Sequence, residues 1–369
     1  MKSIVFRLIS CIYLFSILLP QNKLKFSAET VESAHNNNVT MNLFKKNVEV
    51  KDADRILYAD LATQIPDSNK VILSGNVRMY ENADSLECDE LTIIKNKEDF
   101  YYAVGNVVLK DSLRRVYGDS LLIEYKGSLI NKLNITSNAR IYNNHYLQEK
   151  NRNKAKFFQD EMKANHILVD FNSNEKIDFI LLSGMATADF NVIRENTIKG
   201  INEVSGDSIL IQFIDDVIDI MEVKGGVIGQ FIPDKQNQNI INPILYKANQ
   251  IHYNLNTEKT LLTDDAEVIY GMTILKGGEI EADLNLNLVE SKIKDSILPS
   301  VSSDGESPTY GKYMIFDLTT ERGNITEGYN KMDMGIFKGD NFLTDKNEDV
   351  YINNAIFTSC DLEIPHYHF

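Results

Sequence analysis

Apolar and polar residues alternate with a period of two along most of the chain, the pattern of a strand with one buried face. Val71, Leu73, Val77 and Met79 fall on one side of such a segment, on both sides of Gly75. Helical periodicity is scarce by comparison. The pattern therefore predicts an all-β protein built from half-buried strands.

Short sequence markers recur along this pattern. Gly75-Asn76-Val77 returns as Gly105-Asn106-Val107 at a spacing of 30 residues, and Asp89 returns as Asp119 at the same spacing. A fixed period indicates a stack of rungs in which each rung repeats one supersecondary unit. Gly and Asn accept a positive φ, and Asp caps turns, so we expect these residues where the chain turns towards the next rung. The predicted structural turn residues are Gly75, Asn76, Asp89, Gly105, Asn106 and Asp119.

The alternation also predicts which side chains share an apolar interior. If one odd-numbered parity faces inward on successive strands, the interior forms a continuous groove. The pattern alone is equally typical of an ordinary core, whereas a long aliphatic interior could also hold acyl chains. The expected groove residues are Val71, Leu73, Val77, Met79, Leu91, Ile93, Val107, Leu109, Leu121, Ile123, Ile209 and Ile211.

Composition and local signals divide the chain into five parts. Residues 1–28 have the order of an export signal, with Lys2 and Arg7 before the apolar stretch 8–19. Residues 29–46 are expected to be a loose leader, and residues 47–298 to hold the repeats. Residues 299–310 are rich in Pro and Ser and are expected to be a linker, after which 311–369 return to short strands. Within the repeats, 150–163 is interpreted as an inserted loop or short helix.

The formal net charge of −15 argues against a nucleic-acid partner, which requires a basic surface. No Gly-x-Ser-x-Gly sequence or comparable nucleophile arrangement is present, so the sequence predicts neither an enzyme nor a cofactor. Cys360, His366 and His368 match no common zinc spacing, and no metal site is expected. The recurring acidic residues fit turn capping better than catalysis or calcium binding; they are Asp54, Asp89, Asp119 and Asp207.

Removal of the expected export signal leaves two cysteines, Cys88 and Cys360, in a compartment that permits disulfides. A bridge between them is one interpretation. A buried, unpaired thiol at Cys88 is the other, because neither cysteine belongs to a C-x-x-C pair.

The two Gly-Asn-Val rungs, each followed by an Asp-x-Leu segment, resemble the OstA/LptA-like periplasmic domain of the lipopolysaccharide-transport machinery. The later segments resemble the region that leads into the outer-membrane barrel of LptD, with the barrel itself absent from the chain. Together the two resemblances cover roughly residues 47 to 369. The segments that carry the second resemblance are Phe316-Asp317 to Gly323, Phe337-Lys338-Gly339 and Phe357-Thr358-Ser359-Cys360-Asp361.

The resemblance implies an elongated, open β-jellyroll of antiparallel rungs, located in the periplasm and associated with the outer membrane. It implies a conduit whose interior shields the acyl chains of lipopolysaccharide on the way to the outer membrane. The implied partners are lipid A, other Lpt-type periplasmic β-jellyrolls and an outer-membrane barrel, with a head-to-tail homo-oligomer as a further option. It also implies that Cys360, or Cys88, pairs with a cysteine of the barrel.

Strand edges with few charges and no proline are expected around Ile56 and Tyr58 and along 350–357, where strand addition could join domains.

The alternative functions are a secreted β-helix enzyme that acts on polysaccharide and a purely structural repeat protein. The enzyme would require clustered acidic and basic side chains in register on neighbouring rungs, which Lys110, Arg114 and Arg115 do not have.

Overall fold

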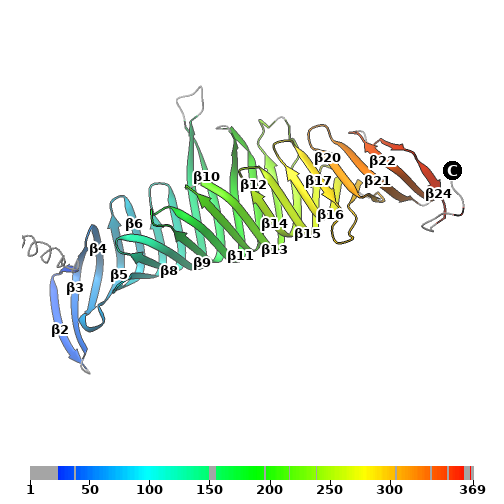
Figure 1. Ribbon diagram of the computed structural model, residues 1–369. Helices are drawn as coiled ribbons and strands as arrows, with labels where there is room; N and C mark the ends of the chain where they lie inside the picture. Colours follow the sequence, from blue (N-terminus) through cyan, green and yellow to red (C-terminus); the bar gives the residue numbers. More distant parts are fainter. Residues whose placement is uncertain are drawn as a thin grey trace, which may run out of the picture. The chain divides into compact units, whose positions relative to one another are not determined.

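The computed structural model describes residues 24–36, 39–148, 155–194, 197–215, 217–237, 239–303, 306–332, 335–346, 349–360 and 366. The expected export signal, up to residue 23, lies outside the described residues. The chain divides into two compact units, residues 1–112 and 113–369. In each unit the strands follow one another in chain order (Figure 1).

Unit 1 consists of seven described strands and one turn of 3-10 helix. Strands β3 to β7 pair with their neighbours in sequence, and β1 and β2 both pair with β3. The elements are β1 (Lys25–Ser27), β2 (Thr30–Asn36), β3 (Val39–Asp52), β4 (Arg55–Ile65), η1 (Pro66–Ser68), β5 (Lys70–Glu81), β6 (Asp84–Lys95) and β7 (Asp99–Lys110).

Unit 2 follows the same plan, with strands of 17 to 20 residues near its beginning and short strands towards its end. Its described elements are β8 (Arg114–Lys126), β9 (Leu129–Gln148), β10 (Ala155–Phe171), β11 (Ile177–Arg194), β12 (Thr197–Ile214), β13 (Val217–Pro233), β14 (Ile244–Asn254), β15 (Lys259–Tyr270), β16 (Thr273–Asp283), β17 (Leu288–Lys292), β18 (Ser300–Ser303), β19 (Thr309–Tyr310), β20 (Tyr313–Asp317), β21 (Arg322–Met332), β22 (Gly335–Thr344), β23 (Val350–Asn353) and β24 (Ile356–Thr358).

Every described strand pairing within the two units is antiparallel. The predicted all-β fold of repeated antiparallel rungs is therefore confirmed. A right-handed β-helix stacks parallel rungs, so this pairing excludes that architecture. Among the described residues, no helix has the length and apolar character needed to cross a membrane.

A column of β-bulges divides the sheet of each unit into two halves. In unit 1 the register shifts between Tyr58 and Leu61 on β4 and between Ser74 and Val77 on β5. In unit 2 it shifts between Ser205 and Ser208 on β12 and at corresponding positions of the neighbouring strands. Because each bulge adds residues to one strand and increases the local twist, the sheet bends along the column. Apolar side chains on the two halves then face one another, and this places the core.

Three sequence expectations about segments are wrong. The described residues of the expected leader 29–46 form β2 and the first part of β3, and β2 pairs with β3 over its full length. The linker 299–310 contains β18 and β19, which join the ladder through β16 and β21. The inserted loop or helix at 150–163 is the start of β10 from Ala155 onward. In all three segments the backbone N–H and C=O groups find partners on a neighbouring strand, and this pairing stabilises a strand even where the side chains are polar.

Of the two expected strand edges, the one around Ile56 and Tyr58 is wrong. Ile56 and Tyr58 belong to β4, which has β3 on one side and β5 on the other. Strands β1 and β2, earlier in the chain, occupy the position beside β3. The segment 350–357 forms β23 and β24, and both pair with β22 in the described structure.

Candidate functional site

The predicted groove residues lie on the buried face of their strands, with one exception. Leu109 is half-buried, and the other eleven are no more than 4% exposed. In unit 1, Leu73 lies opposite Leu91 on the neighbouring strand. In unit 2, Leu121 lies opposite Ile135, and Ile209 lies opposite Val223. The structure therefore gathers the first eight predicted residues in unit 1 and the last four in unit 2.

The expected single parity is wrong on β6. Leu86 and Cys88 are buried before the bulge, whereas Leu91 and Ile93 are buried after it. The extra residue at the bulge moves the buried face from even to odd positions. The sequence prediction therefore missed the even-numbered half of this strand.

The predicted turn residues build the bulge column, inside strands rather than at the junctions between them. Gly105 and Asn106, in the middle of β7, have φ of 78° and 47°. The Asn106 side-chain amide donates a hydrogen bond of 2.9 Å to the Asp89 carboxylate on β6. A Cβ on Gly105 would lie 2.3 Å from Asp89 Oδ2, so only glycine lets the two strands approach this closely.

The same arrangement recurs along the column. On β5, Asn76 donates a hydrogen bond of 2.8 Å to Asp60, a residue that the sequence prediction missed. Asn138 donates to Asp119 at 3.0 Å. Asp54, included among the recurring acidic residues, instead occupies the turn between β3 and β4. These carboxylates are therefore acceptors that fix the bend of the sheet, in keeping with a capping role.

An apolar cavity of about 70 Å³ lies inside unit 2. Its wall comes from both sides of the bulge column: Val204 precedes the bulge on β12 and belongs to one half of the sheet, whereas Ile251 and Leu262 are paired with each other in the other half. The cavity is therefore a space between the two facing halves of the sheet. The lining residues are Phe190, Val192, Asn202, Val204, Met221, Phe231, Ile244, Tyr246, Ile251, Tyr253, Thr260, Leu262, Val268, Ala282, Leu284, Val289 and Leu318.

One polar pair is set into this apolar wall. The Tyr246 hydroxyl donates a hydrogen bond of 2.9 Å to Asn202 Oδ1. The Tyr246 ring lies against Gly229, where a Cβ would come within 2.3 Å of the ring. Burial raises the pKa of Tyr246, and burial together with Glu258 raises the pKa of Tyr253 to about 12. Both phenols are therefore neutral at physiological pH.

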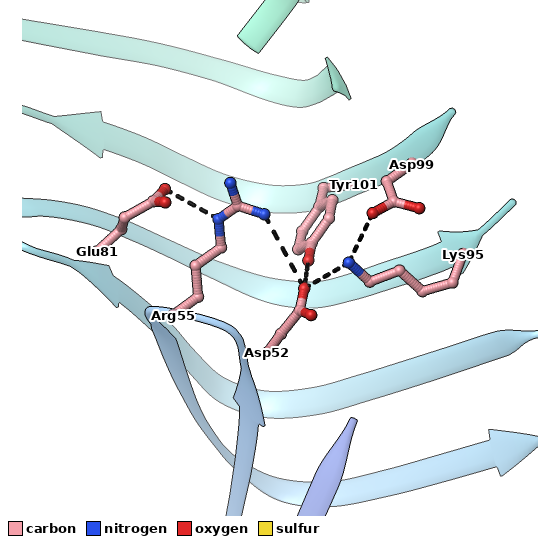
Figure 2. Close-up of polar contacts among 6 residues, drawn as sticks. All are labelled: Asp52, Arg55, Glu81, Lys95, Asp99 and Tyr101. Carbon is pink, nitrogen blue, oxygen red and sulfur yellow. Dashed lines mark hydrogen bonds and ion pairs between the residues drawn. The ribbon is translucent and has the colours of Figure 1, made fainter. Parts of the chain in front are cut away.

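A buried polar cluster joins the two halves of the sheet in unit 1 (Figure 2). Asp52 is the last residue of β3 and is 1% exposed. Its carboxylate accepts a hydrogen bond from the Tyr101 hydroxyl and forms an ion pair of 2.6 Å with the Lys95 ammonium. Lys95 also pairs with Asp99 at 2.7 Å, and Arg55 pairs with Glu81 at 2.9 Å.

This cluster connects strand ends that lie on opposite sides of the bulge column. Asp52 follows the bulge of β3, whereas Lys95 and Tyr101 belong to the half of β6 and β7 that pairs with the start of β5. Burial, reinforced by the Asp52 carboxylate, raises the pKa of Tyr101. The cluster therefore closes the open side of the folded sheet at this level with mutually satisfied charges.

The two cysteines of the described part of the chain differ in burial. Cys88 and Cys360 are free thiols. Burial raises the pKa of Cys88 to about 12, which leaves it protonated and unreactive. Cys360 Sγ lies 3.9 Å from His366 Nδ1, and His368 falls outside the described residues. No group of three His, Cys, Asp or Glu side chains within the described part could hold a metal ion.

Comparisons with known proteins give a structural likeness and no match in sequence. No family model matches the chain, and no curated protein matches it. Its structure is similar to a crystal structure of LptH from Pseudomonas aeruginosa, described as the LptA-homologous periplasmic component of the lipopolysaccharide transport device. The match has 12% sequence identity and a TM-score of 0.29, and it covers 37% of this chain and 82% of that chain.

Proposed function

We propose that this protein is a periplasmic lipid-binding conduit that shields the acyl chains of lipopolysaccharide during transport to the outer membrane. One observation carries the proposal: within each unit, apolar side chains on the two halves of the bent sheet face one another, and in unit 2 they enclose a cavity. An acyl chain can replace this contact between the halves, while the sugar and phosphate groups stay in water.

The energetics support a protein-lined path for such a lipid. Each buried methylene contributes about 0.8 kcal/mol, so several acyl chains cannot cross water at a useful rate without apolar cover. Valine, leucine and isoleucine on the inner face provide that cover. Neutral Tyr246 and Tyr253 add polarity without charge at the cavity.

The finer assignment follows from the resemblance of the sequence. We propose a domain of the kind that precedes the barrel of LptD, associated with the outer membrane and joined to other Lpt-type β-jellyrolls through strand edges. Among the described residues β24 pairs with β22 alone, and we propose its other edge for this pairing by strand addition. Cys360, half-buried and free, is the thiol proposed to pair with the barrel.

A binding assay with fluorescently labelled lipopolysaccharide tests the proposal at the cavity. Val268 lines the cavity and is 5% exposed, whereas its neighbour Ile269 is half-buried and absent from the cavity wall. Val268→Phe places a ring in the space that an acyl chain would occupy. We expect it to weaken lipopolysaccharide binding by roughly tenfold, a loss equivalent to about two buried methylenes.

Ile269→Phe is the matched control, since it adds the same ring on the other face of the same strand. It should bind lipopolysaccharide as the unsubstituted protein does. Equal binding by both variants, with both folded by circular dichroism, would contradict an interior site.

A further inference from the structure

The cavity of unit 2 has a polar pair on each half of the sheet. Asn202 and Tyr246 precede the bulges of their strands, β12 and β14. Tyr253 and Thr260 lie directly opposite each other on β14 and β15, in the other half. All four side chains line the cavity and are half-buried, and none of the described lining residues is charged. The wall therefore offers hydrogen bonds within an apolar and uncharged surrounding.

The first pair is held in place across an intervening strand. Tyr246 lies on β14 and Asn202 on β12, with β13 between them. The Tyr246 ring lies over Gly229 of β13, where a Cβ would come within 2.3 Å of the ring. A glycine at this position lets the Tyr246 hydroxyl reach Asn202 Oδ1, at 2.9 Å. The packing therefore fixes both polar groups at the cavity wall.

Hydrogen-bonding capacity remains after this bond has formed. An asparagine amide has two N–H donors besides its oxygen, and a tyrosine oxygen can accept a hydrogen bond while it donates one. Tyr253 and Thr260 each carry a hydroxyl, which can both donate and accept. The wall thus combines donors and acceptors around one small space. A ligand hydroxyl matches this set because it also does both, whereas an ester oxygen only accepts.

A charged group does not fit the same space. An ionised carboxylate or phosphate that leaves water needs an opposite charge or several donors, and no described lining residue is a cation. The raised pKa values of Tyr246 and Tyr253 keep both phenols neutral at physiological pH. The headgroup of a lipid therefore stays outside, and a polar atom that enters the cavity is neutral.

We propose that the interior of unit 2 selects acyl chains that carry a hydroxyl group, and that Tyr246 and Asn202 determine this preference. The inference rests on the proposed function, since it specifies which acyl chains the same cavity holds. The apolar wall receives the methylenes on either side of the hydroxyl, and the polar pairs receive the hydroxyl itself. Such a site discriminates because a ligand without the hydroxyl leaves polar groups of the wall without a partner.

Displacement of a fluorescent fatty acid from the full chain measures the preference. The competitors are tetradecanoic acid and derivatives that carry one hydroxyl near the carboxyl end, in the middle or near the methyl end of the chain. Binding of labelled lipopolysaccharide is measured in parallel. We expect at least one hydroxylated acid to bind roughly tenfold more tightly than tetradecanoic acid.

Two variants assign the preference to the polar pair on β12 and β14. Tyr246→Phe keeps the ring and removes the hydroxyl, so the preference should fall below about twofold. Tyr246→Phe combined with Asn202→Leu makes the pair apolar. This double variant should bind tetradecanoic acid roughly threefold more tightly than the hydroxylated acid, because a buried hydroxyl then lacks these partners. A reversal of this kind cannot come from misfolding, which would weaken the binding of both acids.

Tyr270→Phe is the matched control. Tyr270 is 4% exposed and lies opposite Ile244 of the cavity wall, but it does not itself line the cavity. Its hydroxyl has no hydrogen-bond partner among the described residues. Removal of this hydroxyl should leave the preference for the hydroxylated acid unchanged.

The outcomes separate this inference from the proposed function. Equal binding of all the acids by a protein that binds lipopolysaccharide would overturn the inference alone, as would binding of lipopolysaccharide without any of the acids. A preference that persists in Tyr246→Phe, or that is lost in Tyr270→Phe, would overturn the assignment to Tyr246 and Asn202. Failure of lipopolysaccharide and of every acid to bind would contradict the proposed function itself.

Discussion

The Lys95 ammonium lies 2.6 Å from the Asp52 carboxylate, on strands separated by the whole of β4 and β5. The pair joins the two halves of the bent sheet of unit 1 and is sealed by the ring of Tyr101, whose centre lies 5.3 Å from the Lys95 ammonium. A sheet that bends to enclose an apolar interior must also close or protect its open side. In unit 1 the Lys95–Asp52 ion pair connects the two halves of the sheet across that open side.

Neutralising Asp52 should therefore destabilise unit 1. Asp52→Asn leaves Lys95 and Arg55 without their shared buried carboxylate, and we expect a loss of about 3 kcal/mol in the free energy of unfolding. Urea denaturation measures this loss. Asp54→Asn, at an exposed position in the adjacent turn, should change the free energy of unfolding by less than about 0.5 kcal/mol. Similar values for the two variants would show that the cluster contributes little.

The close approach of strands at the bulge column predicts how far a methyl group, added at a glycine, lowers the free energy of unfolding. Gly105 and Gly127 both have positive φ, at 78° and 70°, but only Gly105 faces a carboxylate on the next strand. At Gly127 no atom beyond the adjacent residues of the chain lies within 4 Å of the position of a Cβ, among the described residues. Gly127→Ala should cost roughly 1 kcal/mol, from backbone strain. Gly105→Ala should cost roughly 3 kcal/mol, because the clash with Asp89 is added. Thermal unfolding of both variants separates these contributions, and equal losses would refute the close approach.

Asp119 should tolerate replacement by asparagine. The amide oxygen of Asp119→Asn can still accept the hydrogen bond from Asn138, and Asn165 already faces Gly184 at another level of the column. We expect a change below about 0.5 kcal/mol in the free energy of unfolding, against about 1 kcal/mol for Asp119→Ala, which removes the acceptor. Loss of lipid binding in a folded Asp119→Asn protein would instead indicate a carboxylate with a chemical role.

The two cysteines should differ sharply in reactivity. With a pKa of about 12, Cys88 is a thiolate in on the order of one molecule in ten thousand at pH 8. Iodoacetamide should therefore label Cys360 in the native protein and Cys88 after denaturation, as peptide mass spectrometry can determine. Rapid native labelling of Cys88 would contradict its burial.

The same shift sets a dependence of stability on pH. The unfolded chain loses the Cys88 proton near pH 9.0, whereas the folded chain keeps it until about pH 12. The free energy of unfolding should therefore fall as pH rises from about 9 towards 12, and Cys88→Ala should abolish this part of the fall. An unchanged alkaline slope in Cys88→Ala would assign it to other groups.

Much of the fold could be predicted because the period-two alternation directly reports which face of a strand is buried. Val71, Leu73, Leu121 and Ile123 were identified on this basis and are buried. At the bulges the buried face changes parity, so the alternation alone predicts the wrong side chains as buried there. In β6 the spacing from Cys88 to Leu91 is three residues, and this shift was the available signal that the buried face changes parity.

Long-range polar contacts could not be predicted in the same way. Asp52 and Tyr101 are 49 residues apart, and nothing local in either segment marks them as partners. Asp60 lies outside the 30-residue marker pair, so its equivalence to Asp89 became apparent through its hydrogen bond to Asn76. Strand β2 was missed because its polar sequence is stabilised by backbone pairing with β3.

A site-specific photo-crosslink is the most direct test that lipid occupies the interior. Leu121 is fully buried on the inner face of β8, and the adjacent Leu122 is half-buried on the opposite face. A photoreactive amino acid at each position, in cells that make radiolabelled lipopolysaccharide, compares the two faces of one strand. Capture of lipopolysaccharide at Leu121 and not at Leu122 is the predicted result. Equal capture at both positions, or capture at Leu122 alone, would contradict a lipid path between the two halves of the sheet.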